Sequence, residues 1–227
     1  MLALFRDTID FKIGQSPTPP ATAQSESDTT CSDDYYGATT GSGPDRPTNG
    51  PNDWSSQPSF NVERENPYYG DERNFITSKD AVIEQAGGWN DETQVRPGSE
   101  YLIRANIHNG APNREEYVAR NTRIRIQVPK CVGRSMEVRS VIEASNAYPA
   151  QIWDGTILRS VSPFKIEFVY GSGRLYTNSS PSGIPLPDSV FDPEKGALIG
   201  STALDGNFGG DYVNGGILIV RVKAVSA

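Results

Sequence analysis

Histidine is the side chain most often used for acid–base chemistry near neutral pH, and this chain of 227 residues contains one, His108. A Ser-His-Asp triad or a Cys-His pair would therefore depend on His108 alone. The chain has no G-x-S-x-G motif, the pattern that presents a nucleophilic serine on a sharp turn. A single histidine at a strand end is more often an ordinary solvated side chain. We predict no catalytic residue and no enzymatic activity.

Neighbouring carboxylates could serve glycoside hydrolysis, which uses one carboxyl group as acid and a second as base or nucleophile. Three pairs stand out in the chain, namely 33–34, 71–72 and 91–92. Adjacent acids in turns usually carry only solvated charge. We interpret all three pairs in this way.

The stretch LDGNFGGD has oxygen-bearing side chains at Asp205, Asn207 and Asp211, a spacing that resembles a calcium loop. An EF-hand loop needs Glu at its twelfth position, where this chain has Gly216. The surrounding pattern also indicates strands instead of helices, so a hairpin turn is the favoured interpretation. We expect no metal and no cofactor, and these three residues are weak metal candidates only.

Aromatic side chains offer a different chemistry, because their flat rings match the faces of sugars. Tyr68, Tyr69 and Trp89 are possible glycan contacts, and Trp89 lies in the loop-like stretch GGWNDE. Trp153 could join such a platform or could be a core tryptophan of a β-sandwich. We predict that Trp153 belongs to the core.

Cys31 and Cys131 are the only cysteines of the chain. Two such cysteines fit one long-range disulfide, which would stabilise the fold by about 4 to 5 kcal/mol in the chain-entropy account. The alternative is two free or buried thiols. A disulfide would indicate an oxidising compartment, and we predict that the bond forms.

Short apolar–polar alternations recur from Phe60 onward, and this period of two is typical of half-buried strands. Turn motifs such as RPGS and HNGAPN separate them. The chain is also rich in Gly and Pro, which points to many turns. We predict an all-β domain over residues 59–227, an antiparallel β-sandwich. The clearest alternating sets are Tyr101, Ile103, Ala105 and Ile107; Ile124, Ile126 and Val128; Phe164, Ile166, Phe168 and Tyr170; and Leu218, Val220, Val222 and Ala224.

Two classes of partner are disfavoured by composition. The net charge of −7 repels phosphate backbones, so we expect no nucleic acid. No apolar run approaches the roughly 20 residues that span a bilayer, so we expect no membrane span.

Residues 1–14 show a further alternation, with apolar side chains at Phe5, Ile9, Phe11 and Ile13. An amphipathic helix is the alternative, but Thr8 and Ile9 are β-branched and no N-cap residue precedes them. A lone strand leaves its backbone groups unpaired, so it must dock on its own domain or enter the sheet of a neighbouring subunit. We predict the second, with these four residues forming a donor strand.

Residues 15–58 contain no Val, Ile, Leu, Met or Phe, and they predict an extended linker rich in Pro, Ser and Thr. The opening MLALF is too short for a secretory signal and is followed at once by Arg6 and Asp7. We interpret the chain as a mature or trimmed form whose signal has been removed.

The stretch PGSEYLIRANIHNGAPNREEYVARNTRIRIQVP (97–129) resembles the repeated immunoglobulin-like β-sandwich modules of bacterial surface and secreted proteins. Further blocks follow the same order as in a family of uncharacterised secreted proteins from actinobacteria and candidate-phylum bacteria. The resemblance covers roughly residues 44–227 and implies an immunoglobulin-like fold and an extracellular or cell-surface location. It departs from the family at GNFGGDY, where a cysteine is expected. The blocks are PDRPT (44–48), GDERNF (70–75), AGGWNDE (86–92), ASNAYPAQIWD (144–154), VYGSGRLY (169–176) and LPDS (186–189).

These observations together favour an extracellular structural protein. We expect a subunit of a surface filament or layer that binds copies of itself through residues 1–14. The alternative is a carbohydrate-binding or adhesion module that contacts cell-surface glycans.

Overall fold

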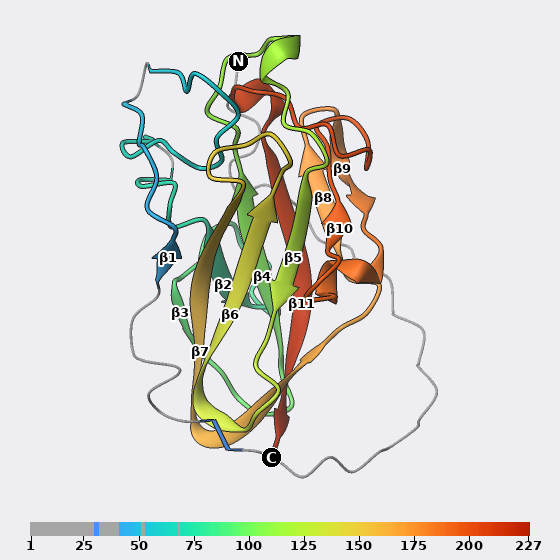
Figure 1. The fold of residues 1–227 in the computed structure, drawn as a ribbon. Helices are drawn as coiled ribbons and strands as arrows, with labels where there is room; N and C mark the ends of the chain where they lie inside the picture. The colour runs from blue at the N-terminus through green and yellow to red at the C-terminus, as the bar shows by residue number, and fades with distance from the viewer. Residues whose placement is uncertain (1–29, 32–40, 51–52, 68) are drawn as a thin grey trace.

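The computed structural model describes residues 30–31, 41–50, 53–67 and 69–227 (Figure 1). Regular structure in these ranges consists of strands and short 3-10 helices, so the predicted all-β class is confirmed. The strands are β1 (Ser42–Gly43), β2 (Ile76–Asp80), β3 (Glu92–Gln94), β4 (Glu100–Ile107), β5 (Arg123–Gln127), β6 (Gly133–Glu143), β7 (Gln151–Phe168), β8 (Arg174–Thr177), β9 (Ser180–Pro185), β10 (Ala197–Leu198) and β11 (Gly216–Ser226). The 3-10 helices are η2 (Glu115–Tyr117), η3 (Asp188–Phe191) and η4 (Tyr212–Asn214).

The strands form one hydrogen-bonded sheet with the order β10-β5-β6-β7-β11-β4-β2. All pairs along this path are antiparallel. The remaining strands attach beside it: β1 and β3 pair with β7, β8 pairs with β11, and β9 pairs with β8. Only the β3–β7 pair among the named strands is parallel.

The long strand β7 belongs to both halves of this sheet. Its residues 151–159 and Phe164 pair with β6, and residues 164–168 pair with β11. Figure 1 shows β5, β6 and the first part of β7 in front of β4 and β11. The sheet therefore folds back on itself around β7, and the two layers fit a β-sandwich, while the immunoglobulin-like strand order stays a prediction.

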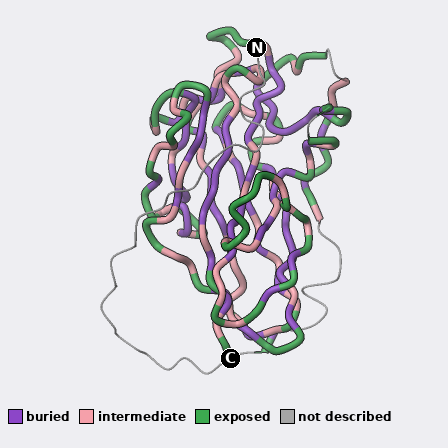
Figure 2. Tube along the Cα trace, turned by 180° about the vertical axis from the view of Figure 1, so that it is seen from behind, coloured by how far each residue is buried: buried purple, intermediate pink, exposed green. Residues whose placement is uncertain are grey.

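The core lies between the two layers, and most of the predicted alternating sets face it. In β4 the four apolar residues of the set are buried, and in β11 the set from Leu218 to Ala224 is buried as well. Ile124 and Ile126 of β5 face them from the other layer, together with Ile142 of β6. Figure 2 shows buried residues running along these strands and exposed residues in the connecting loops.

Two aromatic residues differ from the predicted pattern. Trp153 is only partly buried, because it lies next to core-facing Ile152 and so points to the outer surface of β7. There the guanidinium of Arg139 lies 4.0 Å above the indole ring, so the prediction of a core Trp153 is wrong. Tyr170 is 62% exposed because β7 ends at Phe168.

Part of the segment expected to be a linker packs against the sheet. β1 pairs with Trp153 and Asp154 of β7, and the side chain of Arg46 is buried. Residues 41–50 and 53–58 therefore run along the domain, while the boundary at residue 59 stays a prediction. The predicted strand 1–14 and most of residues 15–40 lie outside the described residues.

The predicted disulfide is present and joins Cys31 to Cys131, with their Cα atoms 5.1 Å apart. The N–H of Cys31 donates to the carbonyl of Val132 at 2.8 Å, and Thr30 pairs with the same residue. The bond closes a loop with a sequence separation of 100 residues. It thus ties the segment around Cys31 to the start of β6.

Replacing both cysteines, as Cys31→Ala with Cys131→Ala, should lower the free energy of unfolding by about 2 to 4 kcal/mol, because the unfolded chain regains its loop entropy. Urea unfolding followed by circular dichroism measures this change. A reductant should destabilise the natural chain by a similar amount and leave the double variant unchanged. Free thiols detected by alkylation of the unreduced protein would contradict the bond.

A buried carboxylate links the two layers. Asp154 of β7 points inward and accepts hydrogen bonds from the backbone N–H groups of Phe75 at 2.5 Å, Ile76 at 2.9 Å and Gly155 at 2.9 Å. Burial raises the pKa of Asp154 from 3.8 to about 7, although these N–H donors oppose the shift. The folded protein therefore retains this proton at pH values where the unfolded chain has lost it.

Because the pKa of Asp154 is higher in the folded state, the free energy of unfolding should decrease as the pH rises from about 4 to about 7. A shift from 3.8 to about 7 corresponds to at most about 4 kcal/mol. Asp154→Asn cannot ionise, so this variant should lack that part of the pH dependence even if its stability is lower at every pH. Urea unfolding at pH 5 and pH 8 tests this, with Asp188→Asn, at an exposed carboxylate that does not act on Asp154, as control. An unchanged slope in Asp154→Asn would contradict the assignment.

Candidate functional site

A groove with a volume of about 740 Å³ lies on the outer face of the layer formed by β4, β8 and β11. Its floor consists of side chains that alternate with core residues, such as Arg104 beside Ala105 and Ile217 beside Leu218. The segments 61–67 and 69–75 and the loop around Gly88 form its walls. The lining side chains include Asn61, Glu63, Asn66, Tyr69, Glu72, Asn74, Trp89, Arg104, Asn106, His108, Tyr176, Tyr212 and Ile217.

One part of the groove is aromatic. Trp89 packs against the outer cluster of Leu102, Tyr176, Ile217 and Ile219. The guanidinium of Arg104 lies 4.6 Å from the centre of the Trp89 ring, a cation–π distance that fixes the indole over the sheet. Tyr69 lines the same groove and is 37% exposed. The sequence-based pair Tyr69 and Trp89 thus meets in one groove.

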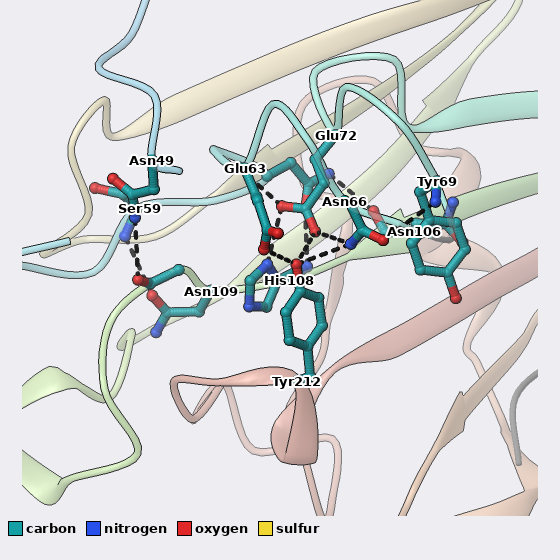
Figure 3. Close-up of polar contacts among 12 residues, drawn as sticks. Asn49, Ser59, Glu63, Asn66, Tyr69, Glu72, Asn106, His108, Asn109 and Tyr212 are labelled. Carbon is teal, nitrogen blue, oxygen red and sulfur yellow. Dashed lines mark hydrogen bonds and ion pairs between the residues drawn. The ribbon is translucent and has the colours of Figure 1, made fainter. Parts of the chain in front are cut away.

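The other end of the groove is a buried polar cluster, drawn in Figure 3. His108 Nδ1 lies 2.9 Å from Glu72 Oε2, and the two residues are 7% and 5% exposed. The hydroxyl of Tyr212 donates to Glu72 Oε1 at 2.9 Å and to Glu63 Oε2. The Tyr212 ring stacks on the imidazole with centroids 3.9 Å apart and an interplanar angle of 12°.

Further amide groups hold this cluster in place. Asn66 Nδ2 donates to Glu72 Oε1 at 2.9 Å and to the Tyr212 hydroxyl at 2.8 Å. The backbone N–H of Glu63 donates to Glu72 Oε2 at 3.2 Å. Both oxygens of Glu72 therefore receive hydrogen bonds from more than one element.

Local backbone conformation places His108 at the end of β4. The N–H of His108 donates to Asn61 Oδ1 at 2.8 Å, and Asn61 has a left-handed φ of 50°, which asparagine tolerates better than most residues. The carbonyl of Asn61 accepts two hydrogen bonds from the buried guanidinium of Arg46, at 3.2 and 3.3 Å. Burial lowers the pKa of Arg46 to about 10, so it remains charged at neutral pH.

Tyr212 reaches the cluster because the stretch GGDY turns tightly. A Cβ on Gly210 would lie 2.3 Å from the carbonyl oxygen of Ala111, so only glycine fits at this position. Asp211 follows with a left-handed φ of 71° and precedes η4, in which Tyr212 is the first residue.

The environment decides the protonation of two groups. Burial alone would raise the pKa of Glu72, but hydrogen bonds from His108, Tyr212 and Asn66 hold it below its usual range. Burial and the negative charges of Glu72 and Glu63 raise the pKa of Tyr212, so its hydroxyl keeps its proton and acts as a donor.

The expectation of a solvated His108 is therefore wrong, and so is that of Glu72 as a solvated turn residue. Asp71, its neighbour, does fit the expectation, because it pairs with Arg73 at 2.6 Å at the surface. Sequence reasoning missed Glu63, Asn66 and Tyr212 altogether. Their spacing carries no recognisable signal, because Glu63 and Asn66 lie in the segment before β2 whereas Tyr212 lies in η4, far away in the sequence.

The other predicted sites lie away from the groove or outside the described residues. Asp205 accepts hydrogen bonds from the backbone N–H and the side chain of Asn207, and these bonds stabilise a turn. Asp211 immediately precedes η4. Tyr68 lies outside the described residues. So do Phe5, Ile9, Phe11 and Ile13, and self-assembly through them stays a prediction.

The arrangement offers two kinds of chemistry. The aromatic part can stack on the ring of a ligand, and the amides and Arg104 around it can exchange hydrogen bonds with polar substituents. The buried part holds two carboxylates, an imidazole and a phenol, which are groups that can move protons or hold a cation.

No family model, no curated protein and no solved structure matches the chain. The resemblance to bacterial surface proteins therefore stays a hypothesis. Within the described ranges, every helix is too short or too polar to cross a membrane. The function is therefore inferred from the fold and from the groove.

The variant Glu72→Gln should lower the free energy of unfolding by about 2 to 4 kcal/mol, because its amide group must face at least one hydrogen-bond donor in a buried site. Because the pKa of Glu72 is depressed in the folded state, the free energy of unfolding of the natural chain should also decrease as the pH falls below about 4.5. The variant should lack this contribution of Glu72 to the pH dependence. Urea unfolding between pH 3 and pH 7 measures both effects. Asp71→Asn is the matched control and should cost no more than about 1 kcal/mol. Equal effects of the two substitutions would contradict a special role for Glu72.

Proposed function

We propose that this protein binds a carbohydrate in the groove on the outer face of β4, β8 and β11. The observation that carries the proposal is that Trp89 and Tyr69, which come from separate loops, both line one polar groove. Sugar rings have an apolar face that stacks on aromatic rings and an edge of hydroxyl groups that needs hydrogen bonds. This groove provides both kinds of contact.

The polar lining suits a neutral or weakly charged sugar. Asn106 Oδ1 has no hydrogen-bond partner among the described residues, which makes it a candidate acceptor for a sugar hydroxyl. Asn74 and Arg104 bring side-chain N–H groups to the same groove. The volume of about 740 Å³ falls within the range of roughly 300 to 1,000 Å³ that is common for ligand sites.

A binding role outside the cell agrees with the disulfide, since such bonds persist in oxidising compartments. We therefore place the protein at the cell surface or among secreted proteins, as an adhesion module. The proposal needs no catalytic step.

Screening of the full chain on a glycan array, followed by calorimetry with the sugars that bind, tests this proposal. Trp89→Ala should weaken binding at least about tenfold, equivalent to about 1.4 kcal/mol, because it removes the largest stacking surface. Tyr69→Ala should weaken binding in the same direction.

The matched control is Tyr170→Ala, since Tyr170 is an exposed aromatic residue that does not line the groove. It should bind like the natural chain. Absence of any binding at millimolar sugar, or equal losses in all three variants, would contradict the proposal.

A further inference from the structure

The buried end of the groove brings together three metal-ligating side chains. Ligand atoms of Glu63, Glu72 and His108 all lie within 4.8 Å of one another, and all three residues are buried. Within the part of the chain that the structure describes, this is the only such group of three or more His, Cys, Asp or Glu residues. Glu63 and Glu72 come from the segment before β2 and His108 follows β4, so the fold brings two distant segments together.

The contact between His108 and Glu72 requires a proton or a cation between the two atoms. At 2.9 Å, the lone pair of a neutral Nδ1 and the carboxylate oxygen would repel each other. A proton on Nδ1 removes the repulsion, and so does a metal ion bound to both atoms. The two atoms are close enough to be neighbouring ligands of one ion.

Charge favours the metal ion over the proton. Two carboxylates leave a net negative charge in a buried site whether the imidazole is neutral with its proton on Nδ1 or is an imidazolium, whereas a divalent cation with a neutral imidazole balances the charge. Glu72 forms an ion pair with His108, at 2.9 Å. Arg46, the buried guanidinium nearby, donates its hydrogen bonds to backbone carbonyls, and its charge attracts Glu72 without a hydrogen bond between them.

The surroundings of Nε2, the second ring nitrogen of His108, are compatible with a metal ion bound to Nδ1. Nε2 is buried and has no hydrogen-bond partner among the described residues. His108 also lines a separate cavity of about 40 Å³, which is large enough for a water molecule. With a metal on Nδ1 the ring proton resides on Nε2, and a water there would accept it, as second-shell groups do at other histidine sites.

We propose that Glu63, Glu72 and His108 bind a divalent transition-metal ion of the zinc type. Two carboxylates and one imidazole suit Zn²⁺, whereas Ca²⁺ prefers six to eight oxygen ligands. Neither cysteine competes for the ion, because both are in the disulfide. The three residues also line the wide groove, which provides a path for the hydrated ion.

The single histidine makes the test specific. Untagged full-length protein is titrated with Zn²⁺ alone, by calorimetry and by nuclear magnetic resonance of the His108 side chain. One equivalent should bind, and the imidazole signals should shift in proportion to the bound fraction. The same concentration of Ca²⁺ should produce no such shift.

Glu63→Gln should weaken Zn²⁺ binding at least tenfold. Its carboxamide oxygen can still accept the Tyr212 hydroxyl, so the fold is retained, which circular dichroism verifies. Asp205→Asn is the matched control in an exposed acidic turn and should bind like the natural chain.

Unshifted His108 signals at saturating Zn²⁺, or equal affinity in Glu63→Gln and the natural chain, would overturn the proposal. If Glu63→Gln does not fold, the histidine signals of the natural chain decide the matter alone. No sugar enters this experiment, so its outcome is independent of the test of carbohydrate binding.

Discussion

The strand β7 is the constraint on which the architecture depends. One continuous stretch of 18 residues pairs first with β6 and then with β11, so the two halves of the sheet cannot separate without breaking its hydrogen bonds. Because the halves face each other across the core, every second residue of β4 and β11 points outward. The floor of the groove consists of these outward residues, and its shape therefore follows from the pairing of β7.

Buried polar groups add a second set of constraints, and each is satisfied by a neighbour distant in sequence. Asp154 connects β7 to the first residues of β2 through backbone N–H groups. Arg46 holds the backbone of Asn61, which in turn holds the N–H of His108. The desolvation penalty of leaving one of these groups unpaired in the interior exceeds the net contribution of its hydrogen bond to stability. These hydrogen bonds therefore specify one arrangement of the loops.

The groove joins two environments that differ in exposure and chemistry. Around Trp89 it is aromatic and open to solvent, which suits a ligand with an apolar face. At Glu72 and His108 it is buried and polar, where the interaction between charges is strong because water is excluded. The two ends share Asn66, Asn106 and Tyr212 as neighbours, so a ligand in the open part would lie beside the buried cluster without needing to enter it.

The sequence by itself determined the all-β class, the inward faces of β4, β5 and β11, and the pairing of the two cysteines. Alternation predicts a strand face because its cause is local, and two cysteines leave one possible intramolecular pair. The sequence also identified Tyr69 and Trp89 as possible glycan contacts, since the ability of an aromatic ring to stack on a sugar is a property of the residue type. Only the tertiary structure decided that His108 and Glu72 are buried and that Trp153 faces outward. It also decided that Glu63, from the same segment as Glu72, and Tyr212, from a distant loop, meet in one cluster. Burial and charge pairing depend on which segments meet in space, and those contacts span up to 149 residues of sequence, far beyond any local pattern.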